Sequence, residues 1–229
     1  MPIDYEIVVK GNSCSLPEGF IGLANLTLVH TGEGPMMFDV GHTVNRAGLV
    51  DGLAARGLVP SDIPRVFLSH LHIDHVMNID LFPFSTKVYV SRTDWEYAAE
   101  PNPNDQFVPW LIREQLAKYD LVLLDGEGEL EPGLRYIAVP GHTPGCTALD
   151  LDTDDKGRVV IAGDAVKFPR ELMTHTVDLA FDTPEHAARS IQAIKVIADR
   201  IVPGHFAEFI RQGDQFIWDD VASMTLRIR

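Results

Sequence analysis

The chain of 229 residues is 45% hydrophobic and 23% charged, which is typical of a soluble globular protein with a substantial core. Its 33 acidic residues exceed its 19 basic ones, and the net charge of −14 argues against binding to nucleic acid or to a membrane through a basic surface. Two cysteines, an N-terminus without a signal-peptide pattern and apolar runs too short to span a bilayer predict a cytoplasmic protein without a disulfide framework.

The first half of the chain alternates short apolar segments with helical patterns. Thr43 is a candidate N-cap for a helix that should end near Arg56, before a glycine and a proline. Helical patterns also cover residues 92–100 and 110–119, with a loop between them. Strands are predicted at residues 5–10, 23–30, 35–38, 66–69 and 87–90.

The second half continues the alternation and contains one strong helix start. Thr183, Pro184 and Glu185 supply a capping hydroxyl, a proline at the first helical position and an acid in the first turn, so we expect a helix to about Asp199. No linker-like stretch interrupts the chain, and we expect residues 1–229 to form a single domain. Strands are predicted at residues 121–124, 134–139, 147–151, 159–162 and 201–202.

The two halves echo one another. In the first, an apolar strand ends in Asp39, a helix follows, and a short apolar strand leads to His70. In the second, an apolar strand ends in Asp164, a helix follows, and a short apolar strand leads to His205. This pattern predicts two related α/β halves whose aspartates and histidines meet at one edge, since ligands in α/β sheets gather at strand ends.

The strongest chemical signal is an H-x-H-x-D-H segment directly after the predicted buried strand at 66–69. Residues two apart in an extended segment point the same way, so His70 and His72 can hold one metal ion. Asp74 and His75 can turn onto a second ion as the chain leaves the strand. Imidazole and carboxylate are suitable ligands for zinc and similar transition metals.

Three single residues later in the chain complete a pattern. His142 lies in a turn with glycines on both sides, which let the backbone bend sharply and approach closely. Asp164 follows a glycine at the end of an apolar strand, and His205 follows a second short strand. Each alone is typical of a loop or cap residue, but their order along the chain is specific.

Taken together, these motifs resemble those of the metallo-β-lactamase-fold hydrolase superfamily. The family order is a strand-end Asp, then H-x-H-x-D-H, a lone His, a lone Asp and a final His, and the resemblance spans nearly the whole chain. It implies an α/β (α+β) fold, a four-layer αββα sandwich with the metal site at one edge of its two sheets. The matching residues are Asp39, His70, His72, Asp74, His75, His142, Asp164 and His205.

The resemblance also implies a role for each of these residues. Two divalent metal ions are expected, with zinc favoured and iron or manganese compatible with the same ligands. Asp39 resembles the aspartate that supports the cluster from outside, although a simple turn residue would fit the same pattern. The implied ligands are His70, His72 and His142 for the first ion, Asp74, His75 and His205 for the second, and Asp164 as the bridge.

Such a pair of cations lowers the pKa of a water molecule between them toward ~7, so that metal-bound hydroxide exists at neutral pH. A substrate carbonyl or phosphoryl oxygen would be polarised by one ion, and the cluster would stabilise the charge that develops. Asp74 is the candidate catalytic residue, because it can also accept a hydrogen bond from the hydroxide and orient it.

The metal motif is shared across the superfamily and does not select the substrate. The chain most resembles compact single-domain hydrolases, which include acyl-homoserine lactonases, and hydrolysis of a small ester, lactone or thioester is expected. Phosphodiester hydrolysis is one alternative, since residues 75–83 resemble the group of the vertebrate metallo-β-lactamase domain-containing protein 1, a nuclease-like member. A mononuclear iron dioxygenase acting on persulfides is the other.

Residues near the motifs allow two interpretations. Lys167 could meet an anionic group of the substrate or be an ordinary solvated lysine. Phe107, Val108, Pro109 and Trp110 could form a hydrophobic wall of the substrate cleft or only pack two helices. We expect a small-molecule substrate and no membrane partner, and a homodimer is compatible with the sequence.

Overall fold

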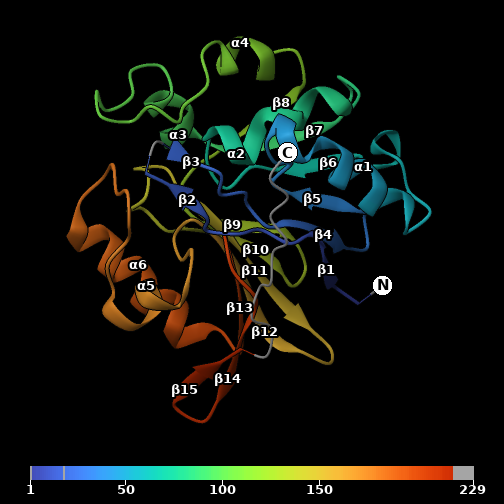
Figure 1. The fold of residues 1–229 in the computed structure, drawn as a ribbon. Coiled ribbons are helices and arrows are strands. Elements are labelled where there is room, and N and C mark those ends of the chain that lie inside the picture. The colour runs from blue at the N-terminus through green and yellow to red at the C-terminus, as the bar shows by residue number, and fades with distance from the viewer. Residues whose placement is uncertain (1, 18, 219–229) are drawn as a thin grey trace.

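The structure is a computed structural model that describes residues 2–17 and 19–218. Two β-sheets pack face to face, and helices cover the outer surface of each (Figure 1). The predicted four-layer αββα sandwich is therefore confirmed.

The first sheet is six-stranded, with strand order β1-β4-β5-β6-β7-β8. Its first three strands are antiparallel, whereas β5 to β8 pair in parallel with their neighbours. The strands are β1 (Asp4–Val9), β4 (Leu26–His30), β5 (Met36–Phe38), β6 (Arg65–Phe67), β7 (Lys87–Ser91) and β8 (Asp120–Leu124).

The second sheet is seven-stranded, with strand order β15-β14-β13-β12-β11-β10-β9. Within it only β12 and β13 are parallel. Its strands are β9 (Gly128–Glu131), β10 (Leu134–Ala138), β11 (Thr147–Thr153), β12 (Gly157–Gly163), β13 (Arg200–Pro203), β14 (Phe209–Gln212) and β15 (Gln215–Ile217). A separate small hairpin joins β2 (Ser15–Leu16) to β3 (Gly19–Phe20).

Helices α1 to α4 lie over the first sheet, and α5 and α6 lie beside the second (Figure 1). No helix within the described part of the chain is both long and apolar enough to cross a membrane. The helices are α1 (Arg46–Ala54), α2 (Ile73–Val76), α3 (Arg92–Tyr97), α4 (Ile112–Leu116), α5 (Pro169–Thr174) and α6 (Pro184–Ile197), and the 3-10 turns are Thr43–Asn45, Pro60–Asp62 and Met77–Leu81.

Burial on both faces explains the continuous apolar runs of the central strands. In β6, Phe67 packs into the core between the sheets, whereas Val66 points into the core beneath α1 and α2. In β12, Val159 and Ile161 join the core between the sheets, and Val160 joins the core beneath α5 and α6. Residues alternate between the faces of a strand, so a strand covered on both sides is apolar throughout.

The echo between the two halves is also confirmed. β5 pairs in parallel with β6, and β12 pairs in parallel with β13. In each pair an aspartate follows the first strand, Asp39 after β5 and Asp164 after β12. A histidine follows the second strand, so two equivalent strand pairs present the residues of the site.

Several local predictions were wrong. Thr43 is not the predicted N-cap: the His42 Nδ1 atom accepts the capping hydrogen bond from the Val44 amide at 3.1 Å, and Thr43 begins a 3-10 turn before α1. Helices α3 and α4 are shorter than the predicted segments 92–100 and 110–119. Both end earlier, and α4 also begins later, because Leu111 before it has a positive φ of 63° and so is not helical. The hairpin β2–β3, the short helices α2 and α5, and strands β9, β14 and β15 were not predicted.

Candidate metal centre

The H-x-H-x-D-H segment connects the buried strand β6 to the short helix α2. His70 and His72 lie in the connection, and Asp74 and His75 lie in the first turn of α2. His70 and His75 have no exposed surface, and His72 is 2% exposed. These three imidazoles are therefore held inside the protein rather than displayed as a surface histidine cluster.

The structure brings all seven residues that the sequence indicated as ligands into one cluster. His142 comes from the loop after β10, Asp164 from the end of β12, and His205 from the end of β13. In each of three overlapping groups the candidate ligand atoms lie within 4.8 Å of one another. The groups are His70, His72 and His142; His70, His75 and Asp164; and Asp74, His75 and His205.

Asp164 lies between the two outer groups. Its Oδ1 is 3.3 Å from Nε2 of His75 and 3.2 Å from Nε2 of His205, whereas its Oδ2 is 3.4 Å from Nε2 of His142. The Asp74 Oδ2 is 3.3 Å from the same Nε2 of His205. The two oxygens of Asp164 thus face different groups, which is the placement needed to bridge two cations.

Hydrogen bonds behind the rings set which nitrogen faces the cluster. Nδ1 of His75 lies 2.7 Å from Asp39 Oδ2, and Nδ1 of His205 lies 3.1 Å from the carbonyl of Asn12. Nδ1 of His70 lies 3.0 Å from the Ser69 hydroxyl. When Nδ1 donates to these oxygens, Nε2 keeps its lone pair, so all three rings present Nε2 as a ligand atom.

His72 is turned the other way. Its Nε2 lies 3.0 Å from Asp105 Oδ2, and its Nδ1 lies 2.9 Å from Nε2 of His142. Donation from Nε2 to the carboxylate leaves Nδ1 with the lone pair that faces the cluster. The group of His70, His72 and His142 therefore offers two Nε2 atoms and one Nδ1 atom.

The polar atoms of the cluster fit bound cations. Buried side-chain atoms without a hydrogen-bond partner in the described residues include Nε2 of His70, Nε2 of His75 and Oδ1 of Asp164, together with Nδ1 of His142. Nε2 of His70, Nε2 of His75 and Oδ1 of Asp164 face the cluster, whereas His142 faces it with its other nitrogen, Nε2. A buried polar atom without a partner is costly, and a metal ion would satisfy each of these three. Nitrogen and carboxylate oxygen donors suit zinc, iron and manganese.

The electrostatics of the cluster differ from one histidine to the next, whereas Asp164 is held ionised. Burial lowers the pKa of His70 and of His142 well below the ordinary value. Burial would also lower the pKa of His75, but Asp74, Asp164 and Asp39 outweigh it and raise that pKa. Burial opposes ionisation of Asp164, yet the neighbouring histidines hold its pKa well below the usual range. Several carboxylates therefore surround His75, and their negative charge would stabilise a bound cation there.

Asp94 joins the two loops that carry the histidines of the first group, and no sequence pattern pointed to it. Its Oδ2 accepts a 2.7 Å hydrogen bond from the Leu71 amide, and its Oδ1 accepts one of 2.5 Å from the Thr143 hydroxyl. Gly145 permits this contact, because a Cβ atom there would lie 2.1 Å from the Asp94 nitrogen. Asp105 and Asn12 were also missed, since their contacts form only when distant loops meet.

Phenylalanine side chains line the first group. The ring of Phe107 lies 5.6 Å from that of His72, and the ring of Phe181 lies 5.6 Å from His72 and 6.0 Å from His142. Phe20, from the β2–β3 hairpin, packs edge-on against Phe107 at 5.7 Å. We call Phe20, Phe107 and Phe181 the aromatic wall. Within the segment 107–110 only Phe107 belongs to it, because Val108 packs into the core and Trp110 is 89% exposed.

Lys167 is buried rather than solvated. It is 6% exposed, and its ammonium lies 2.7 Å from the Asp178 carbonyl and 3.0 Å from Glu171 Oε1. The interpretation as an ordinary solvated lysine was therefore wrong, because the buried Glu171 carboxylate had no signal in the sequence, and contact with a substrate anion stays a prediction. The lysine instead ties the segment that follows Asp164 to α5.

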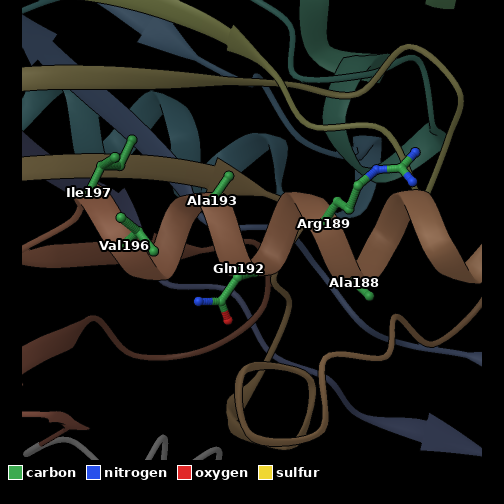
Figure 2. Close-up of a pocket in the computed structure, with 6 residues that line it drawn as sticks. All are labelled: Ala188, Arg189, Gln192, Ala193, Val196 and Ile197. Carbon is green, nitrogen blue, oxygen red and sulfur yellow. The ribbon is translucent and has the colours of Figure 1, made fainter.

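A separate open groove runs along the outer surface of α6 (Figure 2). It is lined by Ala188, Arg189, Gln192, Ala193, Val196 and Ile197, so it offers no histidine or carboxylate that could bind a metal. The candidate site is accordingly the histidine and aspartate cluster.

Comparison with known proteins agrees with this geometry. The model of the Metallo-beta-lactamase superfamily matches residues 20–205. The N-acyl homoserine lactonase AiiA of Bacillus thuringiensis subsp. kurstaki is 28% identical over 199 residues, covering 77% of this chain and 76% of the lactonase. The Metallo-beta-lactamase domain-containing protein 1 of Xenopus laevis is 32% identical over 211 residues, covering 91% of this chain and 82% of the relative.

Solved structures resemble the fold. A quorum-quenching N-acyl homoserine lactone hydrolase superimposes with a TM-score of 0.70 at 25% identity, covering 89% of this chain and 91% of that one. The dizinc quorum-quenching lactonase AidC superimposes with a TM-score of 0.66 at 20% identity, covering 98% of this chain and 93% of that one.

Proposed function

The chain belongs to the metallo-beta-lactamase superfamily, and we propose that it is a dinuclear metal-dependent hydrolase of a small ester, lactone or thioester. The observation that carries the proposal is the pair of ligand groups on either side of Asp164, one of them beside the aromatic wall. The groups supply the metal chemistry, and the wall supplies an apolar surface for the substrate.

The proposed ligands follow from the tautomers and distances. The first ion would be held by three imidazole nitrogens, and the second by Asp74 together with two more imidazoles. Asp164 would bridge them, one oxygen toward each side. The assignment is His70, His72 and His142 for the first ion, and Asp74, His75 and His205 for the second. We propose zinc for both, because this set of nitrogen and carboxylate donors suits it.

Two bound divalent ions would supply an acidified water as nucleophile and a Lewis acid for the substrate carbonyl oxygen. The side chains of the protein do the rest. We propose Asp74 as the catalytic residue that accepts a hydrogen bond from the attacking water and orients it. Its side chain is 17% exposed, against 4% for Asp164, so it is the carboxylate of the cluster most accessible from solvent.

The aromatic wall supports a small apolar substrate over a polyanion. Phe107 and Phe181 flank His72 from two different loops, so a substrate bound at the first ion would lie against these two aromatic rings. The net charge of −14 would also repel a nucleic acid approaching the site. The similarity to N-acyl homoserine lactonases supports a lactone as the first substrate to test.

The test is a substrate panel run on one preparation that has been stripped of metal and then reloaded, one portion with zinc and one with iron. It contains an N-acyl homoserine lactone, an aryl ester, a thioester, an activated phosphodiester and a glutathione persulfide with oxygen uptake as the readout. We expect turnover of a carbonyl substrate that is lost on chelation and restored by zinc. Turnover of the phosphodiester alone, or oxygen consumption by an iron-loaded form alone, would contradict the proposal.

A further inference from the structure

Asp105 is a buried carboxylate outside the seven proposed ligands. It lies between α3 and α4, and its side chain has no exposed surface. Its Oδ2 is close to two donors, Nε2 of His72 at 3.0 Å and the Tyr97 hydroxyl at 2.6 Å. A carboxylate buried to this degree needs such donors to remain in place, and one of them is a proposed metal ligand.

The contact with His72 decides how that ring can bind a metal. An imidazole coordinates through its unprotonated nitrogen, and His72 faces the cluster with Nδ1. Donation from Nε2 to Asp105 keeps the proton on the outer nitrogen and strengthens Nδ1 as a ligand. Asp105 therefore does for His72 what Asp39 does for His75.

The same carboxylate also holds the aromatic wall. The other oxygen of Asp105 accepts a 3.0 Å hydrogen bond from the amide of Phe107. The carbonyl of Phe107 in turn accepts a 2.8 Å hydrogen bond from the amide of Ile73, within the H-x-H-x-D-H segment. The backbone of Phe107 is thus fastened to the metal motif on both sides.

We infer that Asp105 is a positioning residue that sets the ligand tautomer of His72 and the placement of Phe107 together. The inference rests on the proposed function, in which His72 binds metal and Phe107 contacts substrate. Loss of this carboxylate should weaken zinc binding and raise KM for an apolar substrate in the same variant.

Asp105→Asn is the sharpest substitution, because it keeps the shape of the side chain. An amide has one acceptor oxygen and one donor nitrogen. In either orientation its NH2 group opposes the N–H of His72 or the N–H of Phe107, so one of the two hydrogen bonds is lost. Asp150→Asn is the matched control, since Asp150 is also fully buried but is bound by Arg135 and Arg158.

The experiment measures zinc affinity by competition with a chelator, KM for the best substrate of the panel, and the unfolding free energy of each variant. Nuclear magnetic resonance of zinc-loaded wild type adds a readout that needs no substitution. The Nε2 proton of His72 should resonate downfield and exchange slowly with water, because it is bound to a buried carboxylate.

We expect Asp105→Asn to lose about 10- to 100-fold in zinc affinity, the range for partners of a metal-binding histidine, with a raised KM. Asp150→Asn should lose stability while zinc affinity and KM stay at wild-type values. Wild-type zinc affinity together with wild-type KM in Asp105→Asn, or a rapidly exchanging His72 proton in the wild type, would overturn the inference and leave the proposed function standing. Failure of the wild type to bind zinc at all would overturn both.

Discussion

Nδ1 of His75 lies 2.7 Å from Oδ2 of Asp39, and both side chains are buried, Asp39 directly after β5 and His75 in α2. The other oxygen of Asp39 accepts a 2.8 Å hydrogen bond from the amide of Ser69. Asp39 adopts a positive φ of 58°, a region that aspartate tolerates better than most residues. This carboxylate therefore fixes the ring of His75 and the start of the H-x-H-x-D-H segment together.

Asp39→Asn should remove the second metal ion selectively. An amide that keeps its oxygen toward Ser69 would turn its NH2 group toward Nδ1 of His75. The ring would then carry its proton on Nε2, the atom that faces Asp164 and the proposed metal. We expect about 10- to 100-fold weaker binding of one ion with the other retained. Metal content per chain under limiting zinc measures this, and equal loss of both ions would contradict the assignment of His75 to one of them.

Asp164→Ala should damage the site more than removal of a ligand to one ion. Its two oxygens face different groups, so its loss removes the bridge and leaves the repulsion between two cations unshielded. The second ion should be lost first, since the first keeps three imidazoles. Activity should fall by several orders of magnitude, as when a unit of catalytic groups is broken.

The measurements on Asp164→Ala are metal content, hydrolysis rate and circular dichroism of the same preparation. The exposed Asp154, in the β11–β12 turn, provides a control as Asp154→Ala, which should keep both ions and full activity. Two ions and near-normal turnover in Asp164→Ala would show that Asp164 is only a turn residue.

Phe107→Ala should raise KM for an apolar ester or lactone and leave zinc affinity nearly unchanged. The ring lies beside His72, but the backbone of Phe107, which binds Asp105 and Ile73, is retained in the variant. The contact of a single methylene group in an apolar pocket is worth about 1–3 kcal/mol, or roughly 10- to 200-fold, so loss of the ring should raise KM by at least about tenfold. Trp110→Ala is the control, because Trp110 is 89% exposed. Steady-state kinetics should show a raised KM for Phe107→Ala and a wild-type KM for Trp110→Ala. A KM in Phe107→Ala equal to that of the wild type would exclude the Phe107 ring from substrate binding.

Asp150 should make stability depend on pH at the acid end. Burial opposes its ionisation, but hydrogen bonds from Arg158 and Arg135 outweigh burial and hold the pKa of this carboxyl below its ordinary value. A carboxyl with a lowered pKa in the folded state stabilises the protein above the pKa of the unfolded chain, and this contribution is lost as pH falls through the folded pKa. Wild type should therefore exceed Asp150→Asn by about 1.5–3 kcal/mol at pH 7, the range for hydrogen bonds to charged groups.

Urea unfolding of the wild type and of Asp150→Asn at several pH values measures this contribution of Asp150 to stability. The difference in unfolding free energy should stay constant down to about pH 4, near the pKa of the carboxyl in an unfolded chain, and then narrow. A difference that grows below pH 4 would mean that the ion pairs of Asp150 do not contribute in this way.

The central strands and the cluster were readable from the sequence because their signals are local. Two-sided burial makes β6 and β12 continuously apolar, and the residues of the site follow such strands directly. Thr183 also caps α6 as predicted, accepting a hydrogen bond from the His186 amide. These features depend on residues that are neighbours in the chain.

The surroundings of the site were not readable, because they are contacts between distant loops. Asp105 lies 33 residues from His72, and Asn12 lies 193 residues from His205. Neither stands in a motif, and each acquires its role only after two segments pack together. Lys167 shows the same limit, since its exposure is set by the burial of Glu171 in α5.

The most direct test of the account is anomalous X-ray diffraction from crystals of the zinc-loaded protein, with data collected on both sides of the zinc absorption edge. A dinuclear site built from these residues predicts two peaks per chain, one among His70, His72 and His142 and one among Asp74, His75 and His205, with Asp164 between them. A single peak, or zinc bound elsewhere with the cluster empty, would contradict a dinuclear site built from these seven residues.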